Sequence, residues 1–341
     1  MARDARPSQR MIAELAQVSQ SAVSLVVSGQ AEVNRIPLAT RERIERVMAE
    51  VGYVPNVAAR SLKGRRNGLV GVYTYERVFP VREDNYYHEF LVGIEESAVD
   101  LGLDLVLFTS TLGADGSRNV YERGMNRLRL ADGAIFFGLA RDDDELERLA
   151  ADGYPFVFIG RRTIGGAEIP HVTADYAGGI AAVVGTLRDA GHRRIRYVAG
   201  MKPDGPQAER RAAYLAQSRQ AGLEPSLIEI APHEVASSWP RLLGDGVSAL
   251  MVETVELAEA IAHVAAQQSL SIPRDLSVVL LDVPARDAAA ASWSHMALPR
   301  RAMGGAALRL LLARLDDPDA AAPVVLPVSA PDPSTIGPPA G

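Results

Sequence analysis

The residues best placed to do chemistry in this sequence are cations and small polar groups near its N-terminus. Residues 1–66 hold eleven Lys and Arg against six Asp and Glu, a net charge of +5, whereas the remainder holds 25 against 36, a net charge of −11. Grouped cations attract a polyanion, and residues such as Gln20 and Ser21 can bond base edges. This asymmetry predicts that the N-terminal segment alone binds nucleic acid; the alternative is a local charge excess on a solvated surface.

Residues with the types and spacing needed for catalysis or metal binding are missing from the sequence. The chain has no cysteine, which excludes disulfides, thiolate nucleophiles and cysteine-ligated metal sites. The segment from His233 to Ser237 lacks the second histidine of a zinc-protease helix. There is also no nucleophile elbow, phosphate-binding glycine loop or dinucleotide fingerprint. The sequence therefore predicts no enzyme and no cofactor or metal.

Length and composition are those of an ordinary multidomain globular protein. The 341 residues exceed one compact core, and 48% of them are hydrophobic. No apolar run is long enough to cross a membrane, and the basic N-terminus has no apolar stretch behind it that would make a secretory signal. We therefore expect a cytoplasmic protein without a membrane partner.

Three short helices are expected to position the polar groups of the N-terminal segment. Suitable N-caps precede three segments of helical periodicity: Ser8 before the first, Ser19 before 20–27 and Thr40 before 41–51. Their apolar residues would form one small core. A helix-turn-helix needs this arrangement, because the second helix must present its polar N-terminal end to the major groove. Any small three-helix bundle would show a similar pattern.

The rest of the chain alternates short apolar runs with amphipathic helices. This β-α alternation predicts parallel sheets covered by helices on both faces, and the number of strands predicts two Rossmann-like lobes. The expected strands are 69–73, 103–108, 133–138, 156–160, 194–199, 227–230, 249–252 and 276–281. The expected helices are 86–101, 143–152, 176–191, 206–221 and 256–268.

A motif between these two regions resembles the lactose/galactose repressor (LacI/GalR) family of transcription regulators. Gly-Tyr-Val-Pro-Asn at 52–56 is followed by Ala-Arg-Ser-Leu at 59–62, in the order and spacing of that family. Further matches, such as Gly-His-Arg-Arg-Ile at 191–195, extend along the whole chain. The family has this segment at a turn before a strand, which favours a structural role over catalysis for His192. The resemblance implies an all-α helix-turn-helix head and an α/β body of two lobes of the periplasmic-binding-protein type. The implied domains are a head at 1–54, a hinge helix and linker at 55–66, and an effector-binding domain at 67–341, with lobe one at 67–167 and 297–321 and lobe two at 168–296 and 322–336.

For DNA binding, the resemblance implies a homodimer on a pseudo-palindromic operator. A hinge helix at about 56–64 would order on double-stranded DNA, with Leu62 wedged into the minor groove and nearby cations, Arg65 and Arg66 among them, on phosphates. The tail has no leucine heptads, so no coiled-coil tetramer is expected. The expected DNA contacts are Ser19, Gln20, Ser21, Ser24, Asn56, Ala59, Arg60, Leu62 and Lys63.

For ligand binding, the resemblance implies a small-molecule effector, with a sugar as the family's usual choice, held between the two lobes at the carboxyl ends of the strands. An aspartate and arginines between aromatic walls could bind sugar hydroxyls or an acidic ligand. For Arg161 and Arg300 the alternative is a surface ion pair. The expected effector contacts are Tyr73, Tyr75, Phe137, Arg161, Arg210, Asp282 and Arg300.

Several positions depart from the family pattern. Gln17 stands at the turn glycine, so a residue with a side chain must adopt a turn conformation that favours glycine. Ala22 and Leu25 replace a usual Thr and Arg on the DNA face, and Thr254-Val255 replaces a usual Asn-Asp. The operator sequence and the effector therefore cannot be copied from a relative, and inducer and corepressor both stay open. The competing functions are a solute-binding protein without DNA recognition and an α/β enzyme.

Overall fold

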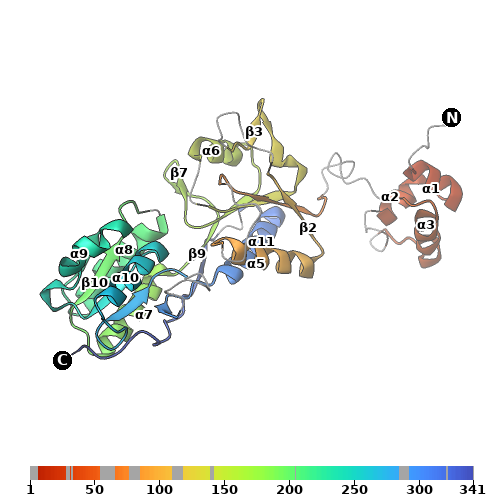
Figure 1. Cartoon of the computed structure of the whole chain (residues 1–341). Coiled ribbons are helices and arrows are strands. Elements are labelled where there is room, and N and C mark those ends of the chain that lie inside the picture. Colours follow the sequence, from red (N-terminus) through yellow and green to blue (C-terminus); the bar gives the residue numbers. More distant parts are fainter. Residues whose placement is uncertain are drawn as a thin grey trace. The chain divides into compact units, whose positions relative to one another are not determined.

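The computed structural model of the chain divides into two compact units, Met1–Asn67 and Gly68–Gly341 (Figure 1). The structure describes residues 7–27, 31, 34–53, 66–76, 85–109, 118–138, 142–203, 205–283, 292–319 and 322–340. The sequence analysis placed the end of the linker at residue 66, and the division between the units follows Asn67. Within the described ranges, no helix is both long and apolar enough to cross a membrane.

The first unit is a small helical bundle. Its helices are α1 (Gln9–Ala16), α2 (Gln20–Val27) and α3 (Leu38–Glu50). Ser8 caps α1 as expected, because its side chain accepts the N–H of Met11. The third helix begins earlier than expected: Pro37, not Thr40, precedes it, since proline has the backbone angle of a helix start and needs no N–H donor there. The core of the bundle consists of Ile12, Ala13, Ala16, Val23 and Ile44.

The turn between α1 and α2 contains the strained residue that the sequence indicated. Gln17 has a φ of 52° and a ψ of 48°, the left-handed conformation that favours glycine. Its N–H donates to the carbonyl oxygen of Glu14 at 3.3 Å and so closes the end of α1. The prediction that a non-glycine residue takes up the turn conformation here is confirmed.

The second unit contains a six-stranded parallel sheet in the order β15-β9-β6-β5-β1-β2. One face packs against α5 and α11, which lie side by side, and the other against α6 (Figure 1). Parallel strands buried on both faces are expected to be continuous apolar runs, as the central strands β1, β5 and β6 are. The elements of this lobe are β1 (Leu69–Tyr73), α5 (His88–Leu101), β2 (Asp104–Leu107), β5 (Gly133–Phe136), α6 (Asp143–Ala151), β6 (Phe156–Ile159), β9 (His171–Ala174), α11 (Arg300–Asp316) and β15 (Val324–Leu326).

Two of these strands correct the expected lobe boundaries. The sequence analysis assigned residues 168–174 and 322–326 to lobe two, but β9 pairs with β6 and β15 pairs with β9 in the first lobe's sheet. Each segment first adds a strand to the sheet of the first lobe and then continues into the second lobe. A short apolar run in the sequence does not show which sheet it will join.

The second lobe is a five-stranded parallel sheet in the order β11-β10-β12-β13-β14. Helices α7 and α8 pack on one face and α9 and α10 on the other. Its elements are α7 (Tyr176–Asp189), β10 (Ile195–Ala199), α8 (Gly205–Gln220), β11 (Ser226–Glu229), α9 (Val235–Leu242), β12 (Ala249–Val252), α10 (Val255–Gln267), β13 (Ser277–Leu280) and β14 (Ser294–His295).

Smaller elements decorate the connections. Two short antiparallel hairpins lie in the loops of the first lobe, and the described residues also form three short 3-10 helices. They are β3 (Tyr121–Glu122) with β4 (Met125–Asn126), β7 (Thr163–Ile164) with β8 (Ala167–Glu168), η1 (Arg127–Leu130), η2 (Pro232–Glu234) and η3 (Gly244–Gly246).

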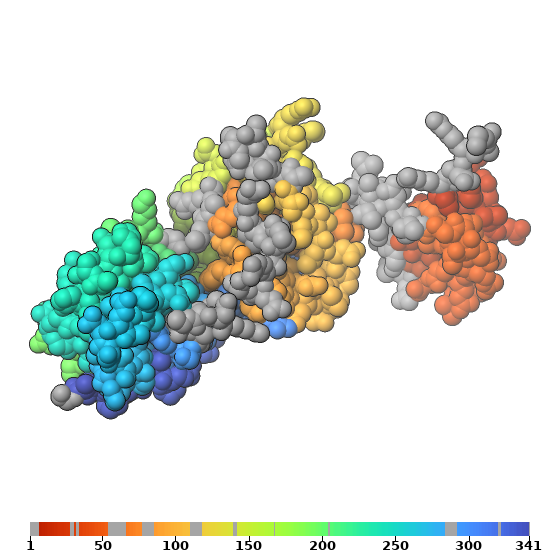
Figure 2. Space-filling view, viewed as in Figure 1, coloured from red at the N-terminus to blue at the C-terminus, as the bar shows by residue number. Residues whose placement is uncertain are grey.

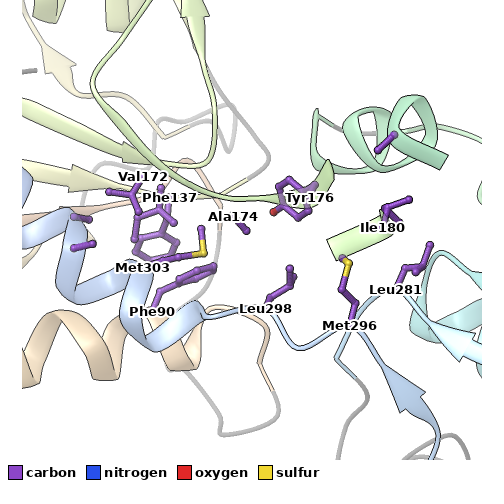
Figure 3. Packing of buried hydrophobic residues seen from close by; sticks show 14 of the residues in the cluster. Phe90, Phe137, Val172, Ala174, Tyr176, Ile180, Leu281, Met296, Leu298 and Met303 are labelled. Atoms are coloured by element: carbon purple, nitrogen blue, oxygen red, sulfur yellow. The ribbon is translucent and has the colours of Figure 1, made fainter. Parts of the chain in front are cut away.

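One hydrophobic cluster runs through both lobes. Phe137 and Met303 pack in the first lobe, whereas Tyr176 and Leu281 belong to the second, with Leu298 on the strand crossover between them (Figure 3). Apolar contact therefore continues across the crossover segments that connect the two sheets.

The C-terminal tail returns to the second sheet. The Val278 N–H donates to the carbonyl oxygen of Thr335 at 3.1 Å, and the blue C-terminal residues lie against the second lobe in Figure 2. His192, fully buried, is bonded on both ring nitrogens: Nδ1 lies 2.8 Å from Ser248 Oγ, and Nε2 lies 2.8 Å from the carbonyl oxygen of Gly337. The histidine that the sequence suggested as structural therefore connects the tail to the sheet.

This histidine should make the stability of the chain depend on pH. Burial lowers the pKa of His192 below its ordinary value of 6.5, although the bond to Gly337 opposes the shift. At low pH the unfolded chain then binds more protons than the folded chain. The contribution of His192 to the free energy of unfolding is therefore fully present above pH 6.5 and declines as pH falls below it, by at most about 1.4 kcal/mol per pH unit. Urea unfolding as a function of pH checks this, and the His192→Gln variant should lack this component. An equal acid slope in both proteins would contradict it.

Candidate functional site

The expected DNA contacts that the structure describes lie at the start of α2. Ser19 caps this helix: its Oγ accepts the N–H of Ala22 at 3.2 Å and lies 2.9 Å from Ser21 Oγ. Gln20 and Ser21 are exposed, and Ser24 is half-buried. The exposed polar end of α2 is therefore free to meet base edges, whereas the hydroxyl of Ser19 already serves the helix cap.

The other expected DNA contacts lie outside the described residues. These are Asn56, Ala59, Arg60, Leu62 and Lys63, together with the whole of the predicted hinge helix at 56–64. Arg66, at the end of this segment, is described and exposed.

Three expected effector contacts come together in the second unit. Arg210 lies on α8, and its guanidinium carbon is 5.7 Å from the ring centre of Tyr176. Arg300 begins α11; its guanidinium carbon is 5.0 Å from the ring centre of Tyr86, and its Nη1 donates to the Tyr86 carbonyl oxygen at 2.8 Å. Asp282 follows β13 at the carboxyl edge of the second sheet. We call these five residues the Arg210 cluster.

The charges of the Arg210 cluster act on one another. Burial raises the pKa of Tyr86, while Arg210 and Arg300 oppose the shift. Burial also raises the pKa of Asp282, again against the two arginines. Burial alone would lower the pKa of Arg210, but Tyr197 and Asp282 more than compensate and the pKa is raised. The cluster therefore combines two cations with a buried carboxylate, and the charges of the three side chains act on one another.

Beside this cluster lies a buried charge network that sequence reasoning missed. Glu253, at the end of β12, is fully buried and accepts two bonds from Arg211, at 2.7 Å from Nε and 2.6 Å from Nη2. It also accepts the hydroxyl of Tyr197 at 2.9 Å and the N–H of Gly200 at 2.8 Å. Arg211 Nη1 reaches Glu229 at 2.7 Å. The signal in the sequence was a glutamate at the end of an apolar strand.

Arg161 adopts the alternative that the sequence left open. Its half-exposed side chain forms ion pairs with Glu168 at 3.0 Å and with Glu209 at 3.3 Å. Both carboxylates compete with a ligand for this guanidinium, and surface pairs of this kind add about 0–1 kcal/mol. Arg300, by contrast, forms no ion pair with any residue that the structure describes.

The aromatic residues expected at the site pack elsewhere. Tyr73 is fully buried, with its ring centre 5.1 Å from that of Phe136 and 5.0 Å from that of Tyr75. Phe137 is also buried, 5.2 Å from the ring of Tyr87. These rings belong to the hydrophobic packing of the first lobe, because side chains alternate between the faces of a strand and both faces are covered here.

The aromatic walls of the Arg210 cluster are instead two tyrosines that the sequence analysis did not select. Tyr176 is the first residue of α7, and Tyr86 lies two residues before α5. Each comes at the start of the helix that follows a strand in a βα unit. A tyrosine at such a position was the signal that could have found them.

Comparisons with known proteins agree with both units. A family model described as "Bacterial regulatory proteins, lacI family" matches residues 10–56, and one described as "Periplasmic binding protein-like domain" matches residues 184–332. The chain is thus a two-part regulatory protein with a helix-turn-helix head and a periplasmic-binding-protein-like body. It belongs to the LacI family of bacterial regulatory proteins.

Individual relatives are regulators as well. The HTH-type transcriptional regulator CelR of Thermobifida fusca is 33% identical over 66% of this chain and 64% of its own length, just under two thirds of the relative. Catabolite control protein A of Priestia megaterium is 27% identical over 80% of this chain and 81% of its own length. Among solved structures, a CelR–cellobiose complex has a TM-score of 0.59 at 25% identity and covers 97% of this chain and 100% of its own. These relatives give no support to an enzyme or to a solute-binding protein without DNA recognition.

Proposed function

We propose that the chain is a transcriptional repressor whose affinity for operator DNA is controlled by a small molecule bound at the Arg210 cluster. The observation that carries the ligand site is Arg210 itself, a buried guanidinium beside two tyrosines, an aspartate and a second arginine. Membership of the LacI family supports the DNA-binding role, and the exposed polar end of α2 supplies a surface for it. CelR, a relative, has a cellobiose complex, which makes a sugar-like effector a reasonable starting point.

The proposed mechanism is a population shift. The chain acts as a homodimer, since a symmetric pair of heads fits a pseudo-palindromic site. The predicted hinge helix at 56–64, with Leu62 as its minor-groove wedge, orders only when the two copies meet on DNA. A ligand that binds one arrangement of the lobes better than the other changes the fraction of dimers competent for DNA. Whether the ligand releases or strengthens operator binding follows from which arrangement it prefers.

Selection of DNA fragments by the purified full-length protein tests the DNA-binding role. The native chain should enrich a sequence with two-fold symmetry. The Gln20→Ala variant should lose preference at one base pair in each half-site, by about 5-fold to 150-fold, since a specific base contact discriminates by about 1–3 kcal/mol. Ala49→Gln, which places a glutamine on the exposed side of α3, should leave the preference unchanged.

Two outcomes of this experiment would contradict the proposal. If the native chain binds no symmetric duplex better than random DNA at moderate salt, with or without metabolite mixtures, the proposed function is wrong. If Gln20→Ala selects the same bases as the native chain, the assignment of Gln20 to base recognition is wrong.

A further inference from the structure

One ion pair joins the two lobes of the second unit. Arg161 follows β6 of the first lobe, and its Nε lies 3.3 Å from Glu209 Oε1 on α8 of the second lobe. The same guanidinium pairs through Nη1 with Glu168, in the β7–β8 hairpin of the first lobe, at 3.0 Å. Every other ion pair between two described residues lies within one lobe or within the N-terminal unit. Arg161 therefore has one carboxylate partner in its own lobe and one in the opposite lobe.

The first lobe holds the backbone of Arg161 in place through the next residue. Arg162 is buried; its Nη1 donates to the carbonyl oxygen of Arg161 at 3.1 Å, and its Nη2 donates to the carbonyl oxygen of Gly138 at 2.8 Å. A Cβ added at Gly205, the first residue of α8, would lie 3.5 Å from Arg162 Nη1. The loop after β6 thus contacts the first two turns of α8 at two places, Gly205 and Glu209.

The ion pair between the lobes is a weak one. Burial raises the pKa of Glu209 above its ordinary value of 4.5; Arg161 opposes this shift most strongly, His171 and Arg210 oppose it less, and Glu168 adds to it. The attraction of Arg161 therefore offsets only part of the cost of burying the carboxylate. Ion pairs with this exposure change an equilibrium by about 5-fold at most, which is small enough for a bound ligand to overcome.

We propose that Arg161 and Glu209 are positioning residues whose ion pair favours the present arrangement of the two lobes and so sets the population on which an effector acts. The inference rests on the proposed function and names a regulation of its site. An equilibrium between two arrangements responds to any contact that only one of them makes, whether that contact comes from a ligand or from the protein itself.

The position of Glu209 on α8 connects this ion pair to the proposed ligand site. The next residue of the helix, Arg210, belongs to the Arg210 cluster. A ligand at the cluster and the guanidinium of Arg161 therefore act on adjacent residues of one helix. A ligand that moves α8 relative to the first lobe must break the ion pair, whereas a ligand that keeps α8 in place gains from it.

Distances between spin labels, one in each lobe, test the inference on the full-length protein. The chain has no cysteine, so Ala150→Cys on α6 and Ala216→Cys on α8, both exposed, supply two unique label sites. Double electron–electron resonance then gives the distance distribution, with excess unlabelled chain present so that distances within one protomer dominate. The variants are Glu209→Arg, the exchanged pair Arg161→Glu with Glu209→Arg, and the matched control Glu168→Arg. The control makes the same charge reversal at the partner within the first lobe.

Glu209→Arg should lower the ratio of the native distance population to all others by about 5-fold or more, because an attraction becomes a repulsion. The exchanged pair should return the ratio to within about 2-fold of the native value, and Glu168→Arg should leave it there. Circular dichroism verifies that each variant is folded.

The inference is overturned if Glu209→Arg leaves the distances unchanged, if the exchanged pair does not restore them, or if Glu168→Arg alters them as much. The measurement uses neither DNA nor a ligand, so these failures leave the proposed function standing. A failure to select any symmetric duplex would conversely leave the measured distances as they are.

Discussion

The Glu253→Ala variant is expected to unfold with a free energy about 3–5 kcal/mol below that of the native chain. Glu253 is fully buried and accepts four hydrogen bonds, two from Arg211 and one each from Tyr197 and Gly200. Its removal leaves a nearly buried guanidinium and a buried hydroxyl without their main acceptor. Losing one member of such a group costs more than the pair contributes, because the remaining charge stays out of water.

Glu229 offers a matched control on the same arginine. Its carboxylate pairs with Arg211 Nη1 at 2.7 Å, but its side chain is half-exposed, so water can replace it. The Glu229→Ala variant should lose no more than about 1 kcal/mol. The chain's two tryptophans, Trp239 and Trp293, both lie in the hydrophobic cluster of the second lobe, so their fluorescence during urea unfolding reports on the lobe that contains the network. Similar losses in both variants would contradict the argument.

A second substitution at Glu253 should alter the proposed ligand site. In the native chain Glu253 holds Arg211 away from any ligand, so the cluster receives one cation from α8, Arg210. The conservative Glu253→Gln variant keeps the size and the acceptor oxygen but removes the negative charge. It should bind an anion such as inorganic phosphate at the Arg210 cluster at least as well as the native chain, because the local positive charge increases, even though its unfolding free energy falls. A loss of affinity in proportion to the loss of stability would mean that Glu253 acts on the fold alone.

The fold could be predicted to the level of units and lobes. The spacing of apolar residues depends on what a segment packs against, so it separated strands from helices. Their alternation then predicted parallel sheets, and the number of strands predicted two lobes. It could not assign β9 and β15, because each strand has only a few residues, and the partner of β15 is also distant in the sequence. The capping signals held at Ser8 and Ser19 but not at Thr40, because the helix begins directly after Pro37, three residues before the expected cap.

Part of the proposed ligand site could be predicted from the sequence. Arg210, Asp282 and Arg300 were expected from the resemblance to the repressor family, and the structure brings them together. Tyr73 and Phe137 were expected at the same site but lie in the core, since the pattern of a strand does not show which of its faces is nearer a ligand. The pairing of Glu253 with Arg211 joins residues far apart in sequence, and no local pattern could indicate it.

The Gly93→Ala variant is expected to lose stability, against the usual preference of helices for alanine. Gly93 lies on α5 where it crosses α11, and a Cβ there would overlap the carbonyl oxygen of Arg301. Gly304 of α11 opposes the carbonyl oxygen of Phe90 in the same way, so the two backbones touch in both directions. Backbone cannot turn aside as a side chain can, so the helices must separate. We expect a loss of about 1–3 kcal/mol or more, measured by thermal unfolding followed with circular dichroism.

Gly185→Ala supplies the control with the opposite sign. Gly185 is also inside a helix, α7, but a Cβ there would meet no atom within 4 Å. This variant should gain up to about 1 kcal/mol, the ordinary benefit of replacing glycine in a helix. If both variants lose stability, replacing any helical glycine would be destabilising, and the contact between α5 and α11 would not explain the effect at Gly93.

The crossing of α5 and α11 also connects stability to the ligand site. Arg300 begins α11 and donates to the carbonyl oxygen of Tyr86, just ahead of α5, so this bond spans the same pair of helices. Separating the helices at Gly93 should stretch the bond and move one of the two cations away from the other. Gly93→Ala should therefore bind an anion such as inorganic phosphate more weakly than Gly185→Ala does, at temperatures where both variants are folded. Unchanged phosphate affinity would show that the crossing supports the fold without positioning Arg300.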